Sequence, residues 1–524
     1  MGADAASYDV VVVGGGHNGL TAAAYLARSG LSVLVLERLD HVGGAAVSAE
    51  AFPGTGARLS RYSYLVSLLP ESIARDLDLG VELRSRSVAS YSPTVRNGRH
   101  HGLFVEHEEG PVTKGSFRAI TGNDREYDAW RTFYSDVAAV AARVAPSLTE
   151  PLVTGRELAE GLDPEIWRGL VERPVGELIE SRFTDDLVRG VVATDALIGT
   201  FASLHDPSLA QNRCFLYHLV GNGTGEWKVP VRGMGAVTDA LAAAANSAGA
   251  EIITSAGVSR IHADDAGAEV TWHDGTRHHS VRCRHVLGNV APWVLRILMG
   301  EDADLETKPV GSQLKINFLL SRLPRLRSGD EPTKAFAGTF HVAEEYTALE
   351  AAYQQAAAGE IPDRPPGELY CHSLTDPSIL GSLADSGAHT LTYFGLHLPE
   401  PLFAHDPAAR KAEAVRRAVA AIDEHLAEPL MGCVLTAPDG SPCVEAKIPQ
   451  EIEADLAMPG GHIFHGDLSW PWASPREALV TPAQQWGVAT DVGAVLLCGS
   501  GARRGGAVSG LGGHNAAQAV LASR

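Results

Sequence analysis

The hydrophobic pattern of the first 37 residues predicts a β-strand, a helix and a second β-strand. Val10–Val13 is an unbroken run of valines, which is typical of a strand that is buried on both of its faces. A glycine-rich turn follows, and we expect a helix from about His17 until Ser29 and Gly30 end it. The next apolar run, SVLVLE, predicts the second strand. This order is that of a βαβ unit.

Two later blocks have a similar α/β pattern. Residues 225–300 combine an Ala-rich helix with strands that alternate apolar and polar positions around Asp274-Gly275, a strong hairpin signal. Residues 455–524 contain a buried strand, VLLCG, and then a second glycine-rich segment. We therefore expect these two blocks to join residues 5–80 in one α/β domain.

The two intervening segments have a different pattern. Residues 81–224 are mostly helical, as in DAWRTFYSDVAAVAARV. Residues 301–454 mix strands (LKINFLL, HTLTYFGLHL) with helices (YTALEAAYQQAAAG, ARKAEAVRRAVAAIDEHL) and proline-rich breaks. We expect them to form one discontinuous α+β domain that binds the substrate.

Composition narrows the range of functions. The chain has 43 basic and 63 acidic residues, a net charge of −20, which disfavours binding to nucleic acid. Its apolar runs are too short to span a bilayer, and no basic amphipathic face indicates membrane association. The six cysteines show neither C-x-x-C nor zinc-ligand spacing, and the first residues, MGADAASYD, lack a secretory signal. We expect a cytoplasmic bacterial protein without a metal site.

The first glycine-rich turn has the spacing of a dinucleotide-binding loop. Gly14, Gly16 and Gly19 form G-x-G-x-x-G between the strand and the helix, so that the pyrophosphate meets the helix N-terminus. Glu37 lies 21 residues beyond Gly16 at the end of the second strand, where an acid binds the ribose hydroxyls and repels a 2′-phosphate. The alternative is a glycine turn that serves only packing. The residues expected to contact the cofactor here are Gly14, Gly16, His17, Asn18, Gly19, Glu37 and Arg38.

The residues after Glu37 favour FAD over NAD. Gly43, Gly44 and Ala45 stand where a second close approach to the cofactor is needed. The chain then enters an irregular stretch instead of the next βαβ crossover of a simple NAD-binding domain.

Several motifs together resemble a known family. GGGHNGL, the ER...GGAA pair, WKVPVRGMGAVTDAL, KINFLL, CHSLTDPSIL, GGHIFHGDLSW and CGSGARRGGAVSG are similar to segments of the phytoene desaturase-like FAD-dependent oxidoreductases. Within that family the chain looks closest to the branch of the carotene ketolases and of pyridine nucleotide-disulfide oxidoreductase domain-containing protein 2. The resemblance implies a glutathione-reductase-like FAD-binding Rossmann domain. Through it, further cofactor contacts are expected at Val258, Gly499, Ser500, Gly501, Gly505, Gly506, Ala507 and Val508.

The predicted chemistry is hydride transfer from the substrate to flavin N5. A redox cysteine pair is missing. The loop GMGAVT at Gly233 follows PVR instead of a strand, so we do not expect a second dinucleotide site. The hypothesis is dehydrogenation of a small organic molecule, either a lipophilic polyene or a soluble natural product, with oxygen or another carrier as electron acceptor.

Three side chains are candidates for catalysis. His465 and Asp467 stand two residues apart on an expected loop, where a carboxylate can orient a histidine that moves a proton; the alternative is that both stabilise the loop. Lys315 lies in an apolar strand. Its side chain either faces the flavin, where the cation would favour the reduced anion, or extends to solvent. Arg58, Arg61 and Tyr64 are candidates for the border of the flavin ring, and Arg503-Arg504 faces either solvent or phosphate.

Two alternatives remain open at this stage. Non-catalytic binding proteins, such as the prenylated-GTPase dissociation inhibitors, share this fold. Relatives of prolycopene isomerase retain FAD and run a redox-neutral isomerisation.

Overall fold

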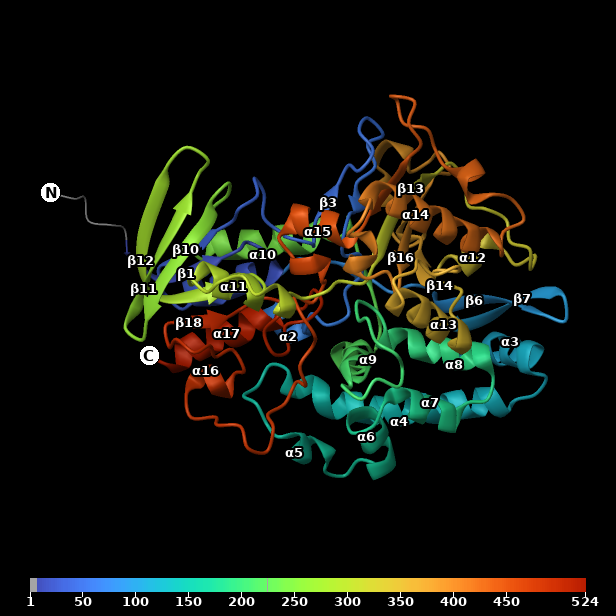
Figure 1. Ribbon diagram of the computed structural model, residues 1–524, viewed down its shortest axis with the longest axis horizontal. Helices are drawn as coiled ribbons and strands as arrows, with labels where there is room; N and C mark the ends of the chain where they lie inside the picture. Colours follow the sequence, from blue (N-terminus) through green and yellow to red (C-terminus); the bar gives the residue numbers. More distant parts are fainter. Residues whose placement is uncertain (1–6, 224) are drawn as a thin grey trace.

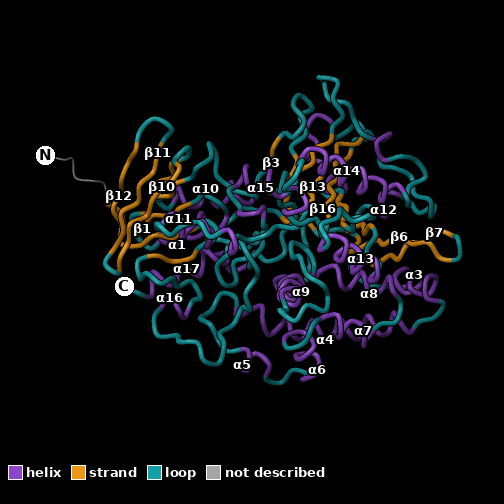
Figure 2. The backbone as a smooth tube through the Cα atoms, viewed as in Figure 1, coloured by secondary structure: helices purple, strands orange, loops and turns teal. Residues whose placement is uncertain are grey.

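The computed structural model describes residues 7–223 and 225–524. Residues 5 and 6, at the start of the predicted first domain, lie outside the described residues, as does most of the segment MGADAASYD. Figures 1 and 2 show two groups of strands, one at each side of the molecule, with helices around and between them.

A seven-stranded sheet forms the core of the part that contains the first βαβ unit. The strand order is β10-β11-β12-β1-β2-β9, and β18 also pairs with β12. β1 runs parallel to β2 and β12, whereas β10, β11 and β12 form an antiparallel meander. The strands are β1 (Ser7–Val13), β2 (Val33–Leu36), β9 (Glu251–Ile253), β10 (Gly257–Asp264), β11 (Gly267–His273), β12 (His278–Gly288) and β18 (Val495–Leu497).

This sheet confirms the α/β fold class. Val10–Val13 is fully enclosed, as the unbroken run of valines predicts. Asp274-Gly275 lies in the turn between β11 and β12, so the predicted hairpin is confirmed. The helices that accompany the sheet are α1 (His17–Arg28), α2 (Glu71–Asp76), α10 (Gly235–Ser247), α11 (Pro292–Leu298), α16 (Pro482–Gln485) and α17 (Leu511–Ala522).

The beginning and the end of the chain meet in this part of the fold. α17 packs against α1, and Figure 1 shows the blue strand β1 and the red helix α17 at the same end of the molecule. β18 adds to the sheet beside β12 in parallel.

A second seven-stranded sheet combines strands from both intervening segments. Its order is β17-β13-β16-β15-β14-β6-β7, antiparallel except for the parallel pair β14 and β6. Residues 81–224 contribute two of these strands and residues 301–454 the other five, although the domain boundaries themselves remain a prediction. The strands are β6 (Val88–Arg96), β7 (Arg99–Glu106), β13 (Leu314–Leu320), β14 (Thr339–Val342), β15 (Gly367–Tyr370), β16 (His389–Gly395) and β17 (Val444–Lys447).

Helices cover this second sheet. The expected helices in DAWRTFYSDVAAVAARV, YTALEAAYQQAAAG and ARKAEAVRRAVAAIDEHL are present as α4, α13 and α14. Figure 1 places α3 to α8 along one edge of the molecule, below the sheet in that view. The helices are α3 (Pro111–Thr121), α4 (Arg125–Ser147), α5 (Gly155–Ala159), α6 (Pro164–Val171), α7 (Val175–Arg182), α8 (Asp186–Ala193), α9 (Ala210–Val220), α12 (Pro332–Ala335), α13 (Tyr346–Ala357), α14 (Pro407–Asp423) and α15 (Pro449–Leu456).

The short remaining strands form two small ribbons. β3 (Ser48–Ala49) pairs with β4 (Leu59–Ser60), and β5 (Leu83–Arg84) pairs with β8 (Val229–Pro230). Among the helices in the described part of the chain, none combines the length and the apolar character needed to cross a bilayer.

Candidate functional site

The first glycine-rich turn connects β1 to α1. Gly14 has a φ of +101°, and a Cβ at Gly19 would stand 2.3 Å from the carbonyl oxygen of Gly14, so both positions require glycine. Gly16 is the N-cap of α1, and no side chain caps this helix. Its first N–H groups are therefore directed at whatever anion binds there. Asn289, directly after β12, donates from Nδ2 to the Gly14 carbonyl at 2.8 Å. The turn fits a pyrophosphate, and Asn289 is a supporting residue that the sequence analysis missed.

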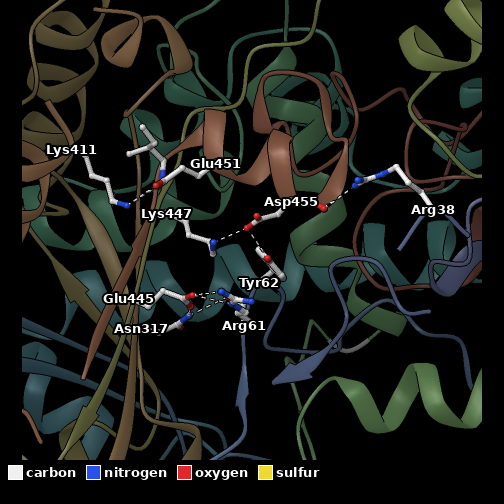
Figure 3. A network of polar contacts seen from close by, with 10 residues as sticks. Arg38, Arg61, Tyr62, Asn317, Lys411, Glu445, Lys447, Glu451 and Asp455 are labelled. Atoms are coloured by element: carbon white, nitrogen blue, oxygen red, sulfur yellow. Dashed lines mark hydrogen bonds and ion pairs between the residues drawn. The ribbon is translucent and has the colours of Figure 1, made fainter. Parts of the chain in front are cut away.

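Glu37 is buried beside this turn. Its Oε2 accepts from the N–H of Gly15 at 2.7 Å, and its Oε1 accepts from the N–H of Leu39 at 2.8 Å. The acid thus stands at the end of β2 as the ribose-binding prediction requires. Arg38 points elsewhere, since its Nη2 donates to the carbonyl of Asp455 at 2.8 Å (Figure 3).

The paired glycines lie against the same turn. Gly43 donates its N–H to the carbonyl of Gly15 at 2.9 Å and forms a β-bridge with Gly16. A Cβ on Gly44 would meet the Cα of Gly16 at 3.5 Å, and Ala45 lines the large cavity described below. The structure therefore brings this predicted group next to the first loop.

Val258 lies on β10, whose start is tied to the end of β2. The N–H of Ala256 donates to the carbonyl of Glu37 at 2.7 Å. The start of β10, and with it Val258, is therefore held near Glu37 in space. This position agrees with the prediction that Val258 lies on the adenine side of the cofactor.

The second glycine-rich segment meets the first one. His17 Nε2 donates to the carbonyl of Ala507 at 3.0 Å, a contact between residues 490 positions apart. Asn18 Nδ2 donates to the carbonyl of Gly505 at 3.5 Å. Gly499–Gly501 follow β18 after one residue, Cys498, beside the end of β12. The two halves of the predicted cofactor site are thus side by side.

A cavity of about 470 Å³ extends from these segments to the second sheet. Both glycine-rich segments contribute to its wall, and so do β13, β14 and β15. The predicted cofactor residues that line it are His17, Ala45, Ser500, Ala507 and Val508.

Lys315 lies in the wall of this cavity. It is on β13 and is buried, so it does not extend to solvent. Its Nζ donates to the carbonyl of Tyr62 at 2.7 Å and stands 4.1 Å from the ring centroid of Tyr64. Burial holds the pKa of Lys315 well below its usual range. Tyr64, another predicted residue, lines the same cavity.

The structure does not assemble His465 and Asp467 into a pair. Asp467 Oδ1 lies 3.7 Å from Nε2 of His462, and the Asp467 side chain is 66% exposed. His465 has a φ of +65°, its buried Nδ1 has no hydrogen-bond partner, and burial lowers its pKa to about 3. Neither residue is among those that line the cavity.

The arginines predicted near the flavin have structural partners. Arg58 donates to the carbonyl of Ser48 at 2.7 Å. Arg61 donates from both Nε and Nη2 to Oε1 of Glu445, at 2.9 and 2.5 Å.

Arg61 belongs to a polar network that joins the two parts of the fold around α15 (Figure 3). The Asp455 carboxylate accepts from Tyr62 Oη at 2.8 Å and from Lys447 Nζ at 2.6 Å. Arg61 and Glu445 form the second connection, from the segment after the paired glycines to β17.

Arg503 and Arg504 have unlike surroundings. Arg503 pairs with Glu477 at 2.9 Å. Arg504 is 1% exposed and donates to three backbone carbonyls, those of Ser147, Glu150 and Trp486. Arg504 therefore holds the second glycine-rich segment to the end of α4 and faces neither solvent nor a phosphate.

The loop at Gly233 leads into α10. The strand before it, β8, has two residues and pairs with β5 outside the main sheet. The N–H groups of Met234 and Gly235 donate to the hydroxyls of Ser60 and Ser48.

An acidic group at the second sheet was missed by the sequence analysis. Asp195, His341 and Glu368 line the cavity and come from the 3-10 turn after α8, from β14 and from β15. Glu344 is hydrogen-bonded to His341 Nδ1, and the Tyr370 hydroxyl donates to Glu368 Oε2. Burial raises the pKa of Asp195 to about 6 and that of Glu368 to about 8. The three cavity residues are too far apart in sequence for any spacing motif to connect them.

A family model described as an NAD(P)-binding Rossmann-like domain matches residues 12–73. Two relatives match this chain over nearly its full length: an uncharacterized protein of Mycobacterium tuberculosis and a mouse protein. The first is 51% identical over 98% of this chain and 97% of its own length. The second, pyridine nucleotide-disulfide oxidoreductase domain-containing protein 2 of Mus musculus, is 31% identical over 98% of this chain and 93% of its own length.

Two of the solved structures with a similar fold are oxidases by name. A putrescine oxidase variant has a TM-score of 0.59 at 18% identity, covering 99% of this chain and 100% of that chain. Cyclohexylamine oxidase from Brevibacterium oxydans has a TM-score of 0.55 at 17% identity, covering 98% of each chain. The chain shares the fold of these oxidases, and its Rossmann-like domain fits a dinucleotide such as the predicted FAD. By its full-length similarity to the mouse protein, this chain belongs to the family of pyridine nucleotide-disulfide oxidoreductase domain-containing protein 2.

Proposed function

We propose that this protein is an FAD-dependent oxidoreductase that dehydrogenates an organic substrate, either a lipophilic molecule or a soluble natural product. One observation carries the proposal: a single cavity is lined by both glycine-rich segments and by the second sheet. Its resemblance to phytoene desaturase-like enzymes supports the same reaction class. So do the names of putrescine oxidase and cyclohexylamine oxidase, which oxidise small molecules. We also retain the prediction of a cytoplasmic enzyme that uses oxygen or another electron carrier.

The residues that would hold FAD follow from the geometry. The free N–H groups at the start of α1 would bind the pyrophosphate, and Glu37 would accept from the ribose hydroxyls. Gly43 and Gly44 allow the backbone to approach the cofactor closely. Ala507 and Val508 would border the isoalloxazine ring, because they line the cavity from the second glycine-rich segment. When bound, FAD would supply a hydride acceptor at N5.

Lys315 is the side chain best placed to hold a proton at the cofactor end of the cavity. Its amine is fixed by the Tyr62 carbonyl and by the face of Tyr64, so its position is defined before a substrate enters. The low pKa caused by burial lets Nζ exchange a proton more readily than an exposed lysine does.

Apolar side chains complete the cavity. Leu65, Phe394, Ile463 and Phe464 line it. They would exclude water from the substrate and strengthen the electrostatic interactions of Lys315. This wall matches an organic substrate with a large apolar part.

The proposal is tested first by the absorbance spectrum of the purified protein and then by the reduction of its flavin by candidate substrates. The purified full-length protein should show a flavin absorbance spectrum, and one of a panel of lipids, isoprenoids and amines should bleach it anaerobically. NADPH alone should not. A colourless protein that refuses added FAD would contradict the proposal, and so would a yellow protein that no panel member bleaches.

A matched pair of variants tests the role of Lys315. Lys315→Met should retain flavin and slow the bleaching, whereas Lys334→Met, at an exposed position on α12, should behave as the wild type. Equal bleaching rates in both variants would remove Lys315 from the mechanism.

A further inference from the structure

The cavity has two chemically different ends. His17, Ala507 and Lys315 lie at the cofactor end, and Glu368 lies at the other. Aromatic rings connect them: Lys315 Nζ stands over Tyr64, whose ring centroid is 4.7 Å from that of Tyr370, and Tyr370 donates to Glu368. The acidic group therefore lies beyond two tyrosine rings from the cofactor end.

The charges along the wall are unbalanced. Burial lowers the pKa of the histidines that line the cavity, so they are neutral near pH 7. The carboxylates that line it are Glu106, Glu109, Asp195 and Glu226, because burial keeps the Glu368 carboxyl protonated at neutral pH, and the cationic side chains are Arg86 and Lys315. Acidic side chains thus outnumber cationic ones, and the cavity attracts a positive charge.

Two neighbouring polar groups at the acidic end lack partners. Thr194 is 2% exposed and lines the cavity; its Oγ1 forms no hydrogen bond of normal length, although it lies near enough to the Glu344 carboxylate to lower the pKa of that group. The Asp195 carboxylate also lines the cavity and forms no hydrogen bond or ion pair with any described residue. Buried polar groups are normally paired, so these two are available to a ligand.

We propose that the acidic end of the cavity binds an ammonium group of the substrate, while the part to be dehydrogenated lies at the cofactor end. The inference rests on the proposed function and names the substrate class for it: an organic molecule that carries a protonated nitrogen away from the reacting carbon. An ammonium offers several N–H donors, and Asp195, Glu368 and Thr194 supply matching acceptors. The aromatic side chain of Tyr134, which also lines the cavity, adds a face suited to a cation.

The pH dependence follows from Asp195. Its carboxyl titrates near pH 6 because burial raises its pKa, so amine binding should weaken as the pH falls through 6. The titratable groups that face it come from four elements and from the loop after β14. They are Tyr134 on α4, Cys214 on α9, His341 on β14, Glu368 on β15 and Glu344.

Isothermal titration calorimetry on the full-length protein tests the proposal without requiring turnover. The probes are hexylamine and octylamine, each against the alcohol of the same length. The amines should bind about 10- to 100-fold more tightly than the alcohols, since charge-assisted hydrogen bonds are lost in the alcohols. Asp195→Asn should abolish this preference without unfolding the protein, because it removes an unpaired charge. Thr194→Val should reduce it, and Glu424→Gln, an exposed carboxylate on the same domain, should leave it unchanged.

Three outcomes would overturn the inference. The first is equal binding of amines and alcohols, and the second is an unchanged preference in Asp195→Asn. The third concerns a metal, because ligand atoms of His341, Glu344 and Glu368 all lie within 4.8 Å of one another. If EDTA-treated protein takes up one Zn²⁺ or Mn²⁺ per chain and the amines do not compete, the acidic end is a metal site. Amine binding that depends on Asp195 would support the cation site even if no substrate bleached the flavin. In that case only the proposed dehydrogenation would be contradicted.

Discussion

Replacing Arg504 by methionine should destabilise the protein far more than the same replacement at Arg503. Both arginines lie in the second glycine-rich segment, and both lose one positive charge and all guanidinium donors in the variant. They differ in what those donors reach. Arg504 reaches three backbone carbonyls at 2.6 to 3.0 Å from a position that is 1% exposed. Arg503 pairs with Glu477 and donates to one backbone carbonyl, that of Trp472 at 3.2 Å, from a side chain that is 23% exposed.

The magnitude follows from these contacts. Each hydrogen bond from a charged donor contributes about 1.5–3 kcal/mol, and the carbonyls of Ser147, Glu150 and Trp486 would be left without these donors. The uncharged methionine avoids burying a guanidinium, which offsets part of the loss. We expect a net loss of about 3–5 kcal/mol for Arg504→Met. A partly exposed ion pair contributes about 0–1 kcal/mol, and the weaker contact with Trp472 adds little, so we expect a loss of about 1 kcal/mol for Arg503→Met.

Urea unfolding followed by circular dichroism measures both losses under the same conditions. The slope of free energy against urea concentration should be similar in the two variants, so that the midpoints are comparable. The reasoning would be refuted by a loss below about 1 kcal/mol at Arg504. A loss at Arg503 as large as that at Arg504 would also refute it.

Three further predictions concern the loop, the acidic end and the domain junction. Gly19→Ala should lower the flavin content of the purified protein, because its Cβ would stand 2.3 Å from the Gly14 carbonyl; full flavin content would contradict this. Burial raises the pKa of Glu368 from 4.5 to about 8. The contribution of this carboxyl to the free energy of unfolding is therefore fully present below pH 4.5, and it is lost as the pH rises through 8. Glu368→Gln should therefore gain free energy of unfolding relative to the wild type between pH 4.5 and 8, and a difference that stays constant with pH would refute the shift. Asp455→Asn should cost about 1–3 kcal/mol in urea unfolding, because Lys447 loses its carboxylate partner; an unchanged midpoint would show that the network in Figure 3 does not stabilise the domain junction.

Local patterns predicted the elements that depend on neighbouring residues. The valine run and G-x-G-x-x-G gave β1, the turn and α1, and Asp274-Gly275 gave the hairpin of β11 and β12. The hairpin of β6 and β7 was missed, although Asn97-Gly98 is its turn and both residues have positive φ. The surrounding segment was interpreted as mostly helical from its longer apolar stretches, and that pattern obscured a shorter signal.

Contacts between distant segments could not be predicted from spacing. Asp195, His341 and Glu368 meet only because β14 and β15 are neighbours in the second sheet and the turn after α8 lines the same cavity. Conversely, His465 and Asp467 are two residues apart but do not pair: Asp467 lies 3.7 Å from His462, and the backbone of His465 adopts a positive φ. Proximity in sequence is a weak guide on a loop whose backbone reverses direction.

The contact of His17 with Ala507 has a consequence for biosynthesis. A ribosome adds about 5–20 residues per second, so about 25–100 s separate the synthesis of these two residues. The early βαβ unit leaves the exit tunnel long before α17 exists, and until then it lacks the helix that packs against α1. Cofactor capture is therefore completed only after α17 has been synthesised, and until then the early βαβ unit lacks the stabilisation that a fully bound nucleotide provides.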